Sequence, residues 1–235
     1  IIRFNMLKIK TLIVALIASA FAFSAMAQTV NMGLTGTVIS YEADGHEKIK
    51  SSGNKTNKSE DGTAAIGSIF IEISDIGDYG TVIGLDVMPY GRKIGDASNS
   101  VPDTDVNDEA DSAGTNKVDV DLANAAMIYI EQPFDADLGI GTPFVKVGYQ
   151  QLTLETDETV ATGSTYGDET MSGYHIGLGM RGDLPTGGFW KTGLTYASYE
   201  GATFNGSLDA DSVRNTIELE DFTTVQFSFS VGQSF

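Results

Sequence analysis

The stretch DFTTVQFSFSVGQSF, Asp221 to Phe235, decides the fold of this chain. Its apolar side chains occupy one parity, and Thr, Gln and Ser occupy the other. The apolar positions are Val225, Phe227, Phe229, Val231 and Phe235. Successive side chains of a β-strand point to opposite faces, so such a strand has one apolar and one polar face. The stretch therefore predicts a β-strand, which we expect to begin at Ile217, because Ile217 and Leu219 share the apolar parity.

Seven further segments upstream alternate in the same way. Each is long enough for a tilted membrane strand, which needs about 9–11 residues. The segments are Val30–Tyr41, Ala64–Ser74, Thr81–Arg92, Val118–Gln132, Thr142–Glu155, Met171–Leu184 and Phe189–Tyr199. Two of them are irregular. Asn124 interrupts the fourth, and the apolar residues of the fifth switch parity at Leu152 and Leu154, for which we predict a β-bulge or an early end of the membrane span near Gln151.

The connections between these segments alternate between long and short. The long ones cover residues 42–63, 93–117, 156–170 and 200–216, and the short ones cover 75–80, 133–141 and 185–188. Outer-membrane barrels have an even number of strands, short periplasmic turns and longer extracellular loops. The pattern predicts an all-β fold, an eight-stranded antiparallel up-and-down transmembrane β-barrel, with both termini in the periplasm.

A soluble β-sandwich or a lipocalin-like barrel would also show short alternating strands. Two features favour the membrane barrel. The polar parity carries charges of both signs, which suits a narrow lumen filled by paired charges. The predicted luminal network is Glu72, Asp86, Arg92, Lys146, His175, Arg181, Asp183 and Lys191. Aromatic residues also lie near the strand ends, as interfacial girdles require. They are Tyr41, Tyr90, Tyr129, Phe134, Tyr174, Trp190, Tyr199, Phe222 and Phe235.

The first residues predict export from the cytoplasm. Lys8 and Lys10 precede an apolar run over residues 11–23, and small residues follow before Gln28. This order is typical of a secretory signal peptide, and we expect cleavage between Ala27 and Gln28. The alternative is a retained transmembrane helix, but the run is shorter than the roughly 20 residues that such a helix needs.

Composition sets further limits on the mature protein. We expect residues 1–5 to lie upstream of the initiator Met6, residues 1–27 to form the signal peptide, and residues 28–235 to form a single barrel domain. The formal net charge of the chain is −18, which repels phosphate backbones and argues against a nucleic-acid partner. The chain has no Cys, so disulfides cannot stabilise it.

The overall pattern resembles the small eight-stranded outer-membrane barrel families typified by the OmpA membrane domain, OmpX and the opacity-type surface proteins. The resemblance covers residues 28–235 and is one of architecture, because no family-specific internal motif is present. It implies contact with outer-membrane lipid and lipopolysaccharide, and recognition by the barrel assembly machinery through the C-terminal strand. The residues expected to form that assembly signal are Phe227, Phe229, Val231 and Phe235.

One acidic segment is a weak candidate for divalent-cation binding. Its oxygen-bearing side chains are Asp103, Asp105, Asn107, Asp108, Glu109 and Asp111. A Ca²⁺ ion takes several oxygens from a short segment, but the EF-hand pattern fails here, because Asp108 stands where Gly is needed and Gly114 where Glu is needed. We expect a solvated acidic loop, and no cofactor.

Three functions remain open. We expect a role in envelope structure and in the display of surface loops. A small porin-like channel for water or cations is the first alternative, because Gly84, Gly148, Gly177, Gly179 and Gly193 lie on the inward parity and leave room. Eight strands, however, leave a lumen that side chains fill.

A lipid-modifying enzyme at the barrel rim is the second alternative, with His46 or His175 as its base. Ser172 and His175 lie on opposite parities and should not meet, so we expect no enzyme. Nothing in the sequence indicates an oligomeric state.

Overall fold

The computed structural model describes residues 29–48, 53, 55–101, 114–136, 138–159, 165–207 and 216–235. The strands are β1 (Thr29–Lys48), β2 (Lys55–Ile76), β3 (Thr81–Val87), β4 (Arg92–Val101), β5 (Gly114–Pro133), β6 (Thr142–Thr159), β7 (Glu169–Asp183), β8 (Gly188–Tyr199), β9 (Ala202–Asn205) and β10 (Thr216–Ser234). Among the described residues no helix is both long and apolar enough to cross a membrane. The predicted signal peptide and the residues from Asp103 to Asp111 lie outside these ranges.

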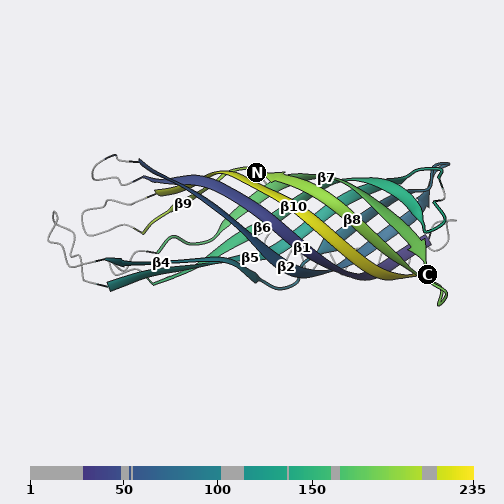
Figure 1. The fold of residues 1–235 in the computed structure, drawn as a ribbon, viewed down its shortest axis with the longest axis horizontal. Helices are drawn as coiled ribbons and strands as arrows, with labels where there is room; N and C mark the ends of the chain where they lie inside the picture. The colour runs from purple at the N-terminus through teal and green to yellow at the C-terminus, as the bar shows by residue number, and fades with distance from the viewer. Residues whose placement is uncertain are drawn as a thin grey trace.

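Eight of the strands form a closed antiparallel barrel (Figure 1). Around the ring they follow the order β1-β2-β3-β5-β6-β7-β8-β10, and β10 pairs back with β1. The remaining two are additions, since β4 pairs with β5 and β9 pairs with β10. The pairing of β1 with β10 gives hydrogen-bond partners to backbone groups that would otherwise lie at the two edges of the sheet. The predicted eight-stranded barrel is confirmed.

The start of β1 and the end of β10 lie side by side at one end of the barrel, which we call the terminal end. The backbone N–H of Phe235 donates to the carbonyl of Val30 at 2.8 Å, and that of Val30 donates back at 3.3 Å. The opposite end, at the left of Figure 1, is called the distal end, and long strand pairs project from it. Much of what we predicted as long connections, notably residues 42–48, 55–63 and 156–159, is therefore strand.

The outer surface of the barrel near the terminal end is apolar. We call this surface the apolar belt, and each of its side chains is at least 41% exposed. Its members are Leu34, Val38, Ile69, Ile83, Ile128, Ile130, Val147, Ile176, Leu178, Leu194, Val225, Phe227, Phe229 and Val231. They come from the alternate positions of every ring strand, so the belt surrounds the barrel. Such a surface suits a hydrocarbon surrounding and not water.

Toward the distal end the polar and apolar faces of the strands exchange sides, and we call this the reversal of sidedness. On β1 the inward positions change from polar Thr35 and Thr37 to apolar Ile39 and Tyr41, while the outward Glu42 is exposed. The inward apolar side chains pack together, and we call them the distal apolar cluster. Its buried members are Met88, Leu122, Ala125, Leu152, Leu154, Met171, Ala197, Tyr199, Ala202, Phe204 and Phe222. The distal part is thus built like a soluble barrel, with an apolar interior and a polar exterior.

Two β-bulges, one on β5 and one on β10, change which side chains of these strands point inward near this reversal. On β5 the register against β6 shifts between Ala123 and Ala126, where Asn124 has a φ of 50°. Asn tolerates this left-handed conformation better than most residues. As a result Leu122 points inward beyond the bulge, although the sequence placed it on the outward parity with Ile128.

Of the two explanations predicted for the fifth segment, a bulge of β6 near Gln151 is wrong, and an early end of the membrane span stays a prediction. The register of β6 against β7 is unbroken from Thr142 to Leu154, and the extra residue at this level belongs to β5. Leu152 and Leu154 are buried inside the barrel. They do not change sides. The lumen itself changes from polar to apolar at this level, so an apolar side chain occupies an inward position.

The second bulge lies on β10, where Glu220 is skipped between the pairs Asp44–Asp221 and Gly45–Leu219. Because of this extra residue, Ile217 and Leu219 pack against the distal apolar cluster. The prediction that they share the outward face of Val225 is therefore wrong, although the strand does begin near Ile217.

The predicted third strand is divided in two. It stops at Val87 and resumes as β4 at Arg92, and β4 pairs only with β5. Strand β2 pairs with β3 over Ile69–Ile76, so its distal portion has no strand partner on that side in the described chain. The hydroxyl of Tyr41 donates a hydrogen bond to the carbonyl of Ile94 near this seam between β2 and β4.

Candidate functional site: the luminal charge cluster

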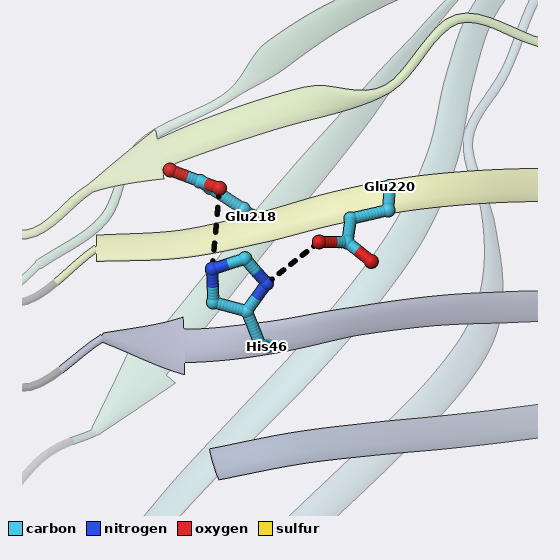
Figure 2. Close-up of side chains that lie close together, drawn as sticks. All are labelled: His46, Glu218 and Glu220. Atoms are coloured by element: carbon cyan, nitrogen blue, oxygen red, sulfur yellow. Dashed lines mark ion pairs between the residues drawn. The ribbon is translucent and has the colours of Figure 1, made fainter. Parts of the chain in front are cut away.

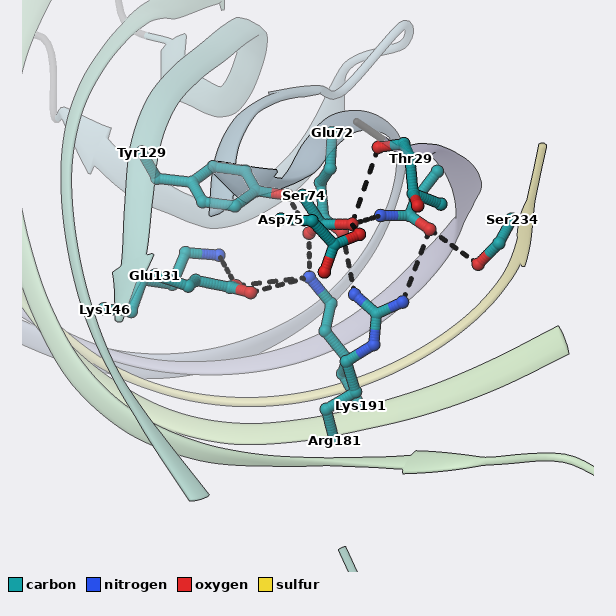
Figure 3. Close-up of polar contacts among 11 residues, drawn as sticks. Thr29, Glu72, Ser74, Asp75, Tyr129, Glu131, Lys146, Arg181, Lys191 and Ser234 are labelled. Atoms are coloured by element: carbon teal, nitrogen blue, oxygen red, sulfur yellow. Dashed lines mark hydrogen bonds and ion pairs between the residues drawn. The ribbon is translucent and has the colours of Figure 1, made fainter. Parts of the chain in front are cut away.

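Five charged side chains meet inside the barrel near its terminal end, and we call them the luminal charge cluster (Figure 3). Its members are Glu72 on β2, Glu131 on β5, Lys146 on β6, Arg181 on β7 and Lys191 on β8. Each occupies the inward parity of its strand, opposite to the apolar belt. Five different strands therefore contribute to one set of ion pairs.

Lys191 lies at the centre of the cluster. Its ammonium donates hydrogen bonds to Oε1 of Glu72 and, at 3.1 Å, to Oε2 of Glu131. All three residues are at most 5% exposed. Burying a charge is unfavourable unless it is paired, and removing one partner of a buried pair is strongly destabilising. The ammonium thus joins strands that lie on different sides of the lumen.

An aromatic residue supports the centre from one side. The hydroxyl of Tyr129 donates to Oε1 of Glu72 at 2.6 Å, and the Lys146 ammonium lies 3.7 Å from the centre of the Tyr129 ring. Lys146 also pairs with Glu131 at 3.6 Å. A cation over an aromatic face is attracted to it by the ring quadrupole. The interface-girdle position that we predicted for Tyr129 is wrong, because this side chain is 2% exposed and lies in the lumen.

Arg181 connects the cluster to the terminal end of the barrel. Its guanidinium lies 3.8 Å from Oε2 of Glu72, donates to Oδ1 of Asn31 at 3.3 Å, and stacks 3.8 Å from the Phe189 ring centre. Oδ1 of Asn31 also accepts a hydrogen bond from the Ser234 hydroxyl at 2.7 Å. The network therefore bridges β1 and β10, the two strands whose pairing closes the barrel.

Aromatic rings fill the space around the charges. A Cβ placed at Gly84 would collide with the Tyr129 ring, and one at Gly179 would collide with the Phe144 ring. The absence of a side chain at these glycines is what lets a neighbouring ring lie flat against the wall. The expectation that inward glycines leave an open path is wrong at these two positions.

Two cavities lie on either side of the cluster. Toward the distal end lies a cavity of about 60 Å³. Its lining residues include Asp86, Lys146, Gln150, His175 and Lys191, and also Leu122 and Met88. Toward the terminal end a wider recess of about 380 Å³ is lined by Thr29, Asp75, Arg181 and Ser234. Residue Glu131 borders both cavities. The paired charges therefore form the partition between them.

The structure brings together four of the eight residues predicted for the luminal network, and a fifth, Asp86, interacts electrostatically with Lys146. His175 is buried in the lumen, but its Nε2 lies 3.1 Å from both Gln150 Oε1 and Tyr199 Oη, apart from the ion pairs. The prediction that Arg92 and Asp183 belong to the luminal network is wrong, because both side chains are exposed at strand ends.

Sequence reasoning missed several inward residues. Glu131 lies on the polar parity of the segment Val118–Gln132 but is not among the residues predicted for the luminal network. The rings of Tyr41, Tyr199 and Phe222 were predicted for the interface girdles, but they pack in or against the distal apolar cluster. By contrast Tyr90, Phe134, Tyr174 and Phe235 are at least 47% exposed. Tyr41, Tyr199 and Phe222 lie on the polar parity of their segments, so alternation is the signal that places them inside the barrel.

His46 lies far from this cluster, on the distal part of β1. It faces Glu218 and Glu220 of β10 (Figure 2). The assembly residues predicted on the last strand, Phe227, Phe229, Val231 and Phe235, are all exposed on the outside of the barrel.

No protein-family model matches the chain, and no curated protein matches it. Solved structures do resemble it. The crystal structure of the outer membrane protein OprG from Pseudomonas aeruginosa has a TM-score of 0.50 and 10% identity, over 87% of this chain and 95% of that one. The solid-state NMR structure of the outer membrane protein AlkL in lipid bilayers has a TM-score of 0.53 and 13% identity, over 88% of this chain and 90% of that one. The chain therefore has the fold of a small bacterial outer-membrane β-barrel.

Replacing Lys191 by Met should destabilise the barrel by about 3–5 kcal/mol, because Glu72 and Glu131 would stay buried without their shared cation. The measurement is urea unfolding of the purified barrel in phospholipid vesicles, followed by tryptophan fluorescence. Lys93→Met is the matched control. Lys93 pairs with Asp119 at 2.8 Å on the exposed distal surface, where the hydrogen bond to Asp119 raises the pKa of Lys93. Its loss should shift the unfolding midpoint little. Equal shifts for the two variants would contradict a buried ion-pair core.

Proposed function

We propose that the protein is an integral outer-membrane barrel with an envelope-structural role that displays acidic surface loops and does not conduct ions. The apolar belt would lie in lipid and contact lipopolysaccharide, and the distal end would project outside the cell with both termini in the periplasm. The observation that carries this proposal is the luminal charge cluster, which lies across the lumen. The assembly machinery would recognise the last strand through its exposed aromatic residues.

The electrostatics of the partition support a closed lumen. Glu72 and Glu131 are 1% and 3% exposed, and each is paired with a cation. An ion crossing this level would have to separate buried partners whose desolvation is already compensated. Eight-stranded barrels in general have interiors that side chains fill. The channel alternative would need the cluster to open.

Planar-bilayer recording tests this proposal. The purified wild-type barrel should insert without conductance steps, whereas the triple variant Glu72→Ala, Glu131→Ala, Lys191→Ala should conduct, because the partition between the two cavities is removed. Heat-modifiable migration in detergent gels checks that both proteins are folded. Reproducible cation-selective steps from the wild type would sink the closed-lumen proposal and favour the porin-like channel.

A second candidate function rests on the distal half. The interior of this half is apolar, and the luminal charge cluster closes it on the side of the terminal end. On the distal side of Ile69, strands β2 and β4 are not paired with each other. Small apolar molecules could therefore enter at the distal end and leave sideways through the seam into the membrane. This route needs no path through the luminal charge cluster.

Uptake of the apolar dye N-phenyl-1-naphthylamine by cells expressing the barrel tests this candidate. Leu152→Asp should lower the uptake, because Leu152 is 1% exposed in the distal apolar cluster and a carboxylate there disfavours an apolar guest. Thr153→Asp, the neighbouring position with the opposite parity, is the control. Equal uptake by both variants and by cells without the barrel would exclude the candidate.

We also propose that the barrel is not an enzyme. His175 faces the lumen and bonds to Gln150 and Tyr199, whereas Ser172 pairs with Gln151 on the other parity. A nucleophile and its base must lie within hydrogen-bond reach. The lipid profile of cells expressing His175→Ala should equal that of cells expressing the wild type. A modified lipid that disappears with this substitution would overturn the proposal.

A further inference from the structure

Three side chains that no proposal above uses converge on the distal part of the barrel (Figure 2). His46 of β1 is the register partner of Glu218 on β10, and Glu220 sits in the β10 bulge next to them. Nε2 of His46 lies 3.2 Å from Oε2 of Glu218, and Nδ1 lies 3.0 Å from Oε1 of Glu220. One donor atom from each residue lies within 4.8 Å of the other two.

The histidine of this cluster is buried and incompletely satisfied. His46 is only 3% exposed, and its Nε2 has no hydrogen-bond partner in the described part of the chain, although Oε2 of Glu218 lies within ion-pair distance of it. An unsatisfied buried polar atom is unfavourable, by about 1–3 kcal/mol. A buried ring nitrogen directed at a carboxylate without bonding to it indicates a site for a group placed between them.

The chemistry of the three donors identifies that group. One imidazole nitrogen and two carboxylates are ligands that Zn²⁺ and related ions bind, whereas Ca²⁺ and Mg²⁺ prefer oxygen alone. With a neutral imidazole the two carboxylates carry a charge of −2, which a dication balances. We infer that His46, Glu218 and Glu220 form a binding site for one divalent transition-metal ion of the Zn²⁺ class.

The strand geometry makes the three donors compatible with one ion. Directly opposed residues of an antiparallel pair have Cβ atoms about 4.5–5.5 Å apart, and diagonal neighbours are about 7–8 Å apart, within reach of long side chains. His46 and Glu218 are the opposed pair, and the bulge brings Glu220 to the same side. A bound ion would join β1 to β10 in the part of the barrel that projects from the apolar belt.

Isothermal titration of ZnCl₂ into the metal-free, folded full-length barrel in detergent tests the inference. The wild type should bind one Zn²⁺ per barrel. The double variant Glu218→Gln, Glu220→Gln should bind more than about tenfold more weakly, since even the loss of an outer-shell partner costs about 10–100-fold in metal affinity. These two side chains are 42% and 60% exposed, so the variant is expected to fold, and heat-modifiable migration checks it.

Two controls separate this site from general acidity. Glu60→Gln removes a carboxylate that pairs with Lys58 on β2 and should leave Zn²⁺ binding unchanged. Replacing Asp103, Asp105 and Asp108 by Asn tests the acidic loop and should also have no effect. Cu²⁺ bound to the wild type should show nitrogen hyperfine coupling in its electron paramagnetic resonance spectrum, and His46→Gln should lose it. The inference is overturned if Zn²⁺ does not bind, if binding follows the loop variant, or if the nitrogen signal persists in His46→Gln.

Discussion

The requirement that a closed sheet present an apolar surface to lipid determines how the rest of this molecule is built. Where the outward positions carry Leu, Val, Ile and Phe, the inward positions must hold the polar groups, and these need partners because little water reaches a lumen of eight strands. Where the strands leave the belt, the outward positions become polar and the interior becomes apolar. One chain therefore contains a membrane-type barrel and a soluble-type barrel joined end to end.

The luminal charge cluster and the two bulges follow from this constraint. Lys191 lies between two carboxylates from distant strands, and Arg181 extends the network to Asn31 and Ser234 at the closing pair. The bulges at Asn124 and Glu220 turn β5 and β10 so that apolar residues face inward beyond the belt. The β10 bulge also places Glu220 beside His46. The same bulge that turns Ile217 and Leu219 inward therefore creates the candidate metal site.

The sequence predicted the ring of eight strands, because period-two alternation and the spacing of turns are local signals. It also predicted four of the charges that enter the lumen, which are Glu72, Lys146, Arg181 and Lys191. It failed where sidedness depends on the rest of the barrel. Nothing local indicates that Leu152 faces an apolar interior or that Arg92 follows a break in its strand. Tyr129 shares the polar parity of Glu131, and it was misplaced because aromatic residues near strand ends were assigned to the girdles. The meeting of His46 with Glu218 depends on a register between the first and last strands.

The central claim is that the sidedness of the strands reverses at the distal border of the belt, and spin-label accessibility measures this directly. Single cysteines would replace Val38 and Glu42, two outward positions on β1, and carry a nitroxide in the barrel reconstituted in lipid vesicles. The account predicts that the label at position 38 collides with oxygen but not with a water-soluble nickel chelate, and that the label at position 42 collides with the nickel chelate. Equal nickel accessibility at both positions would contradict it.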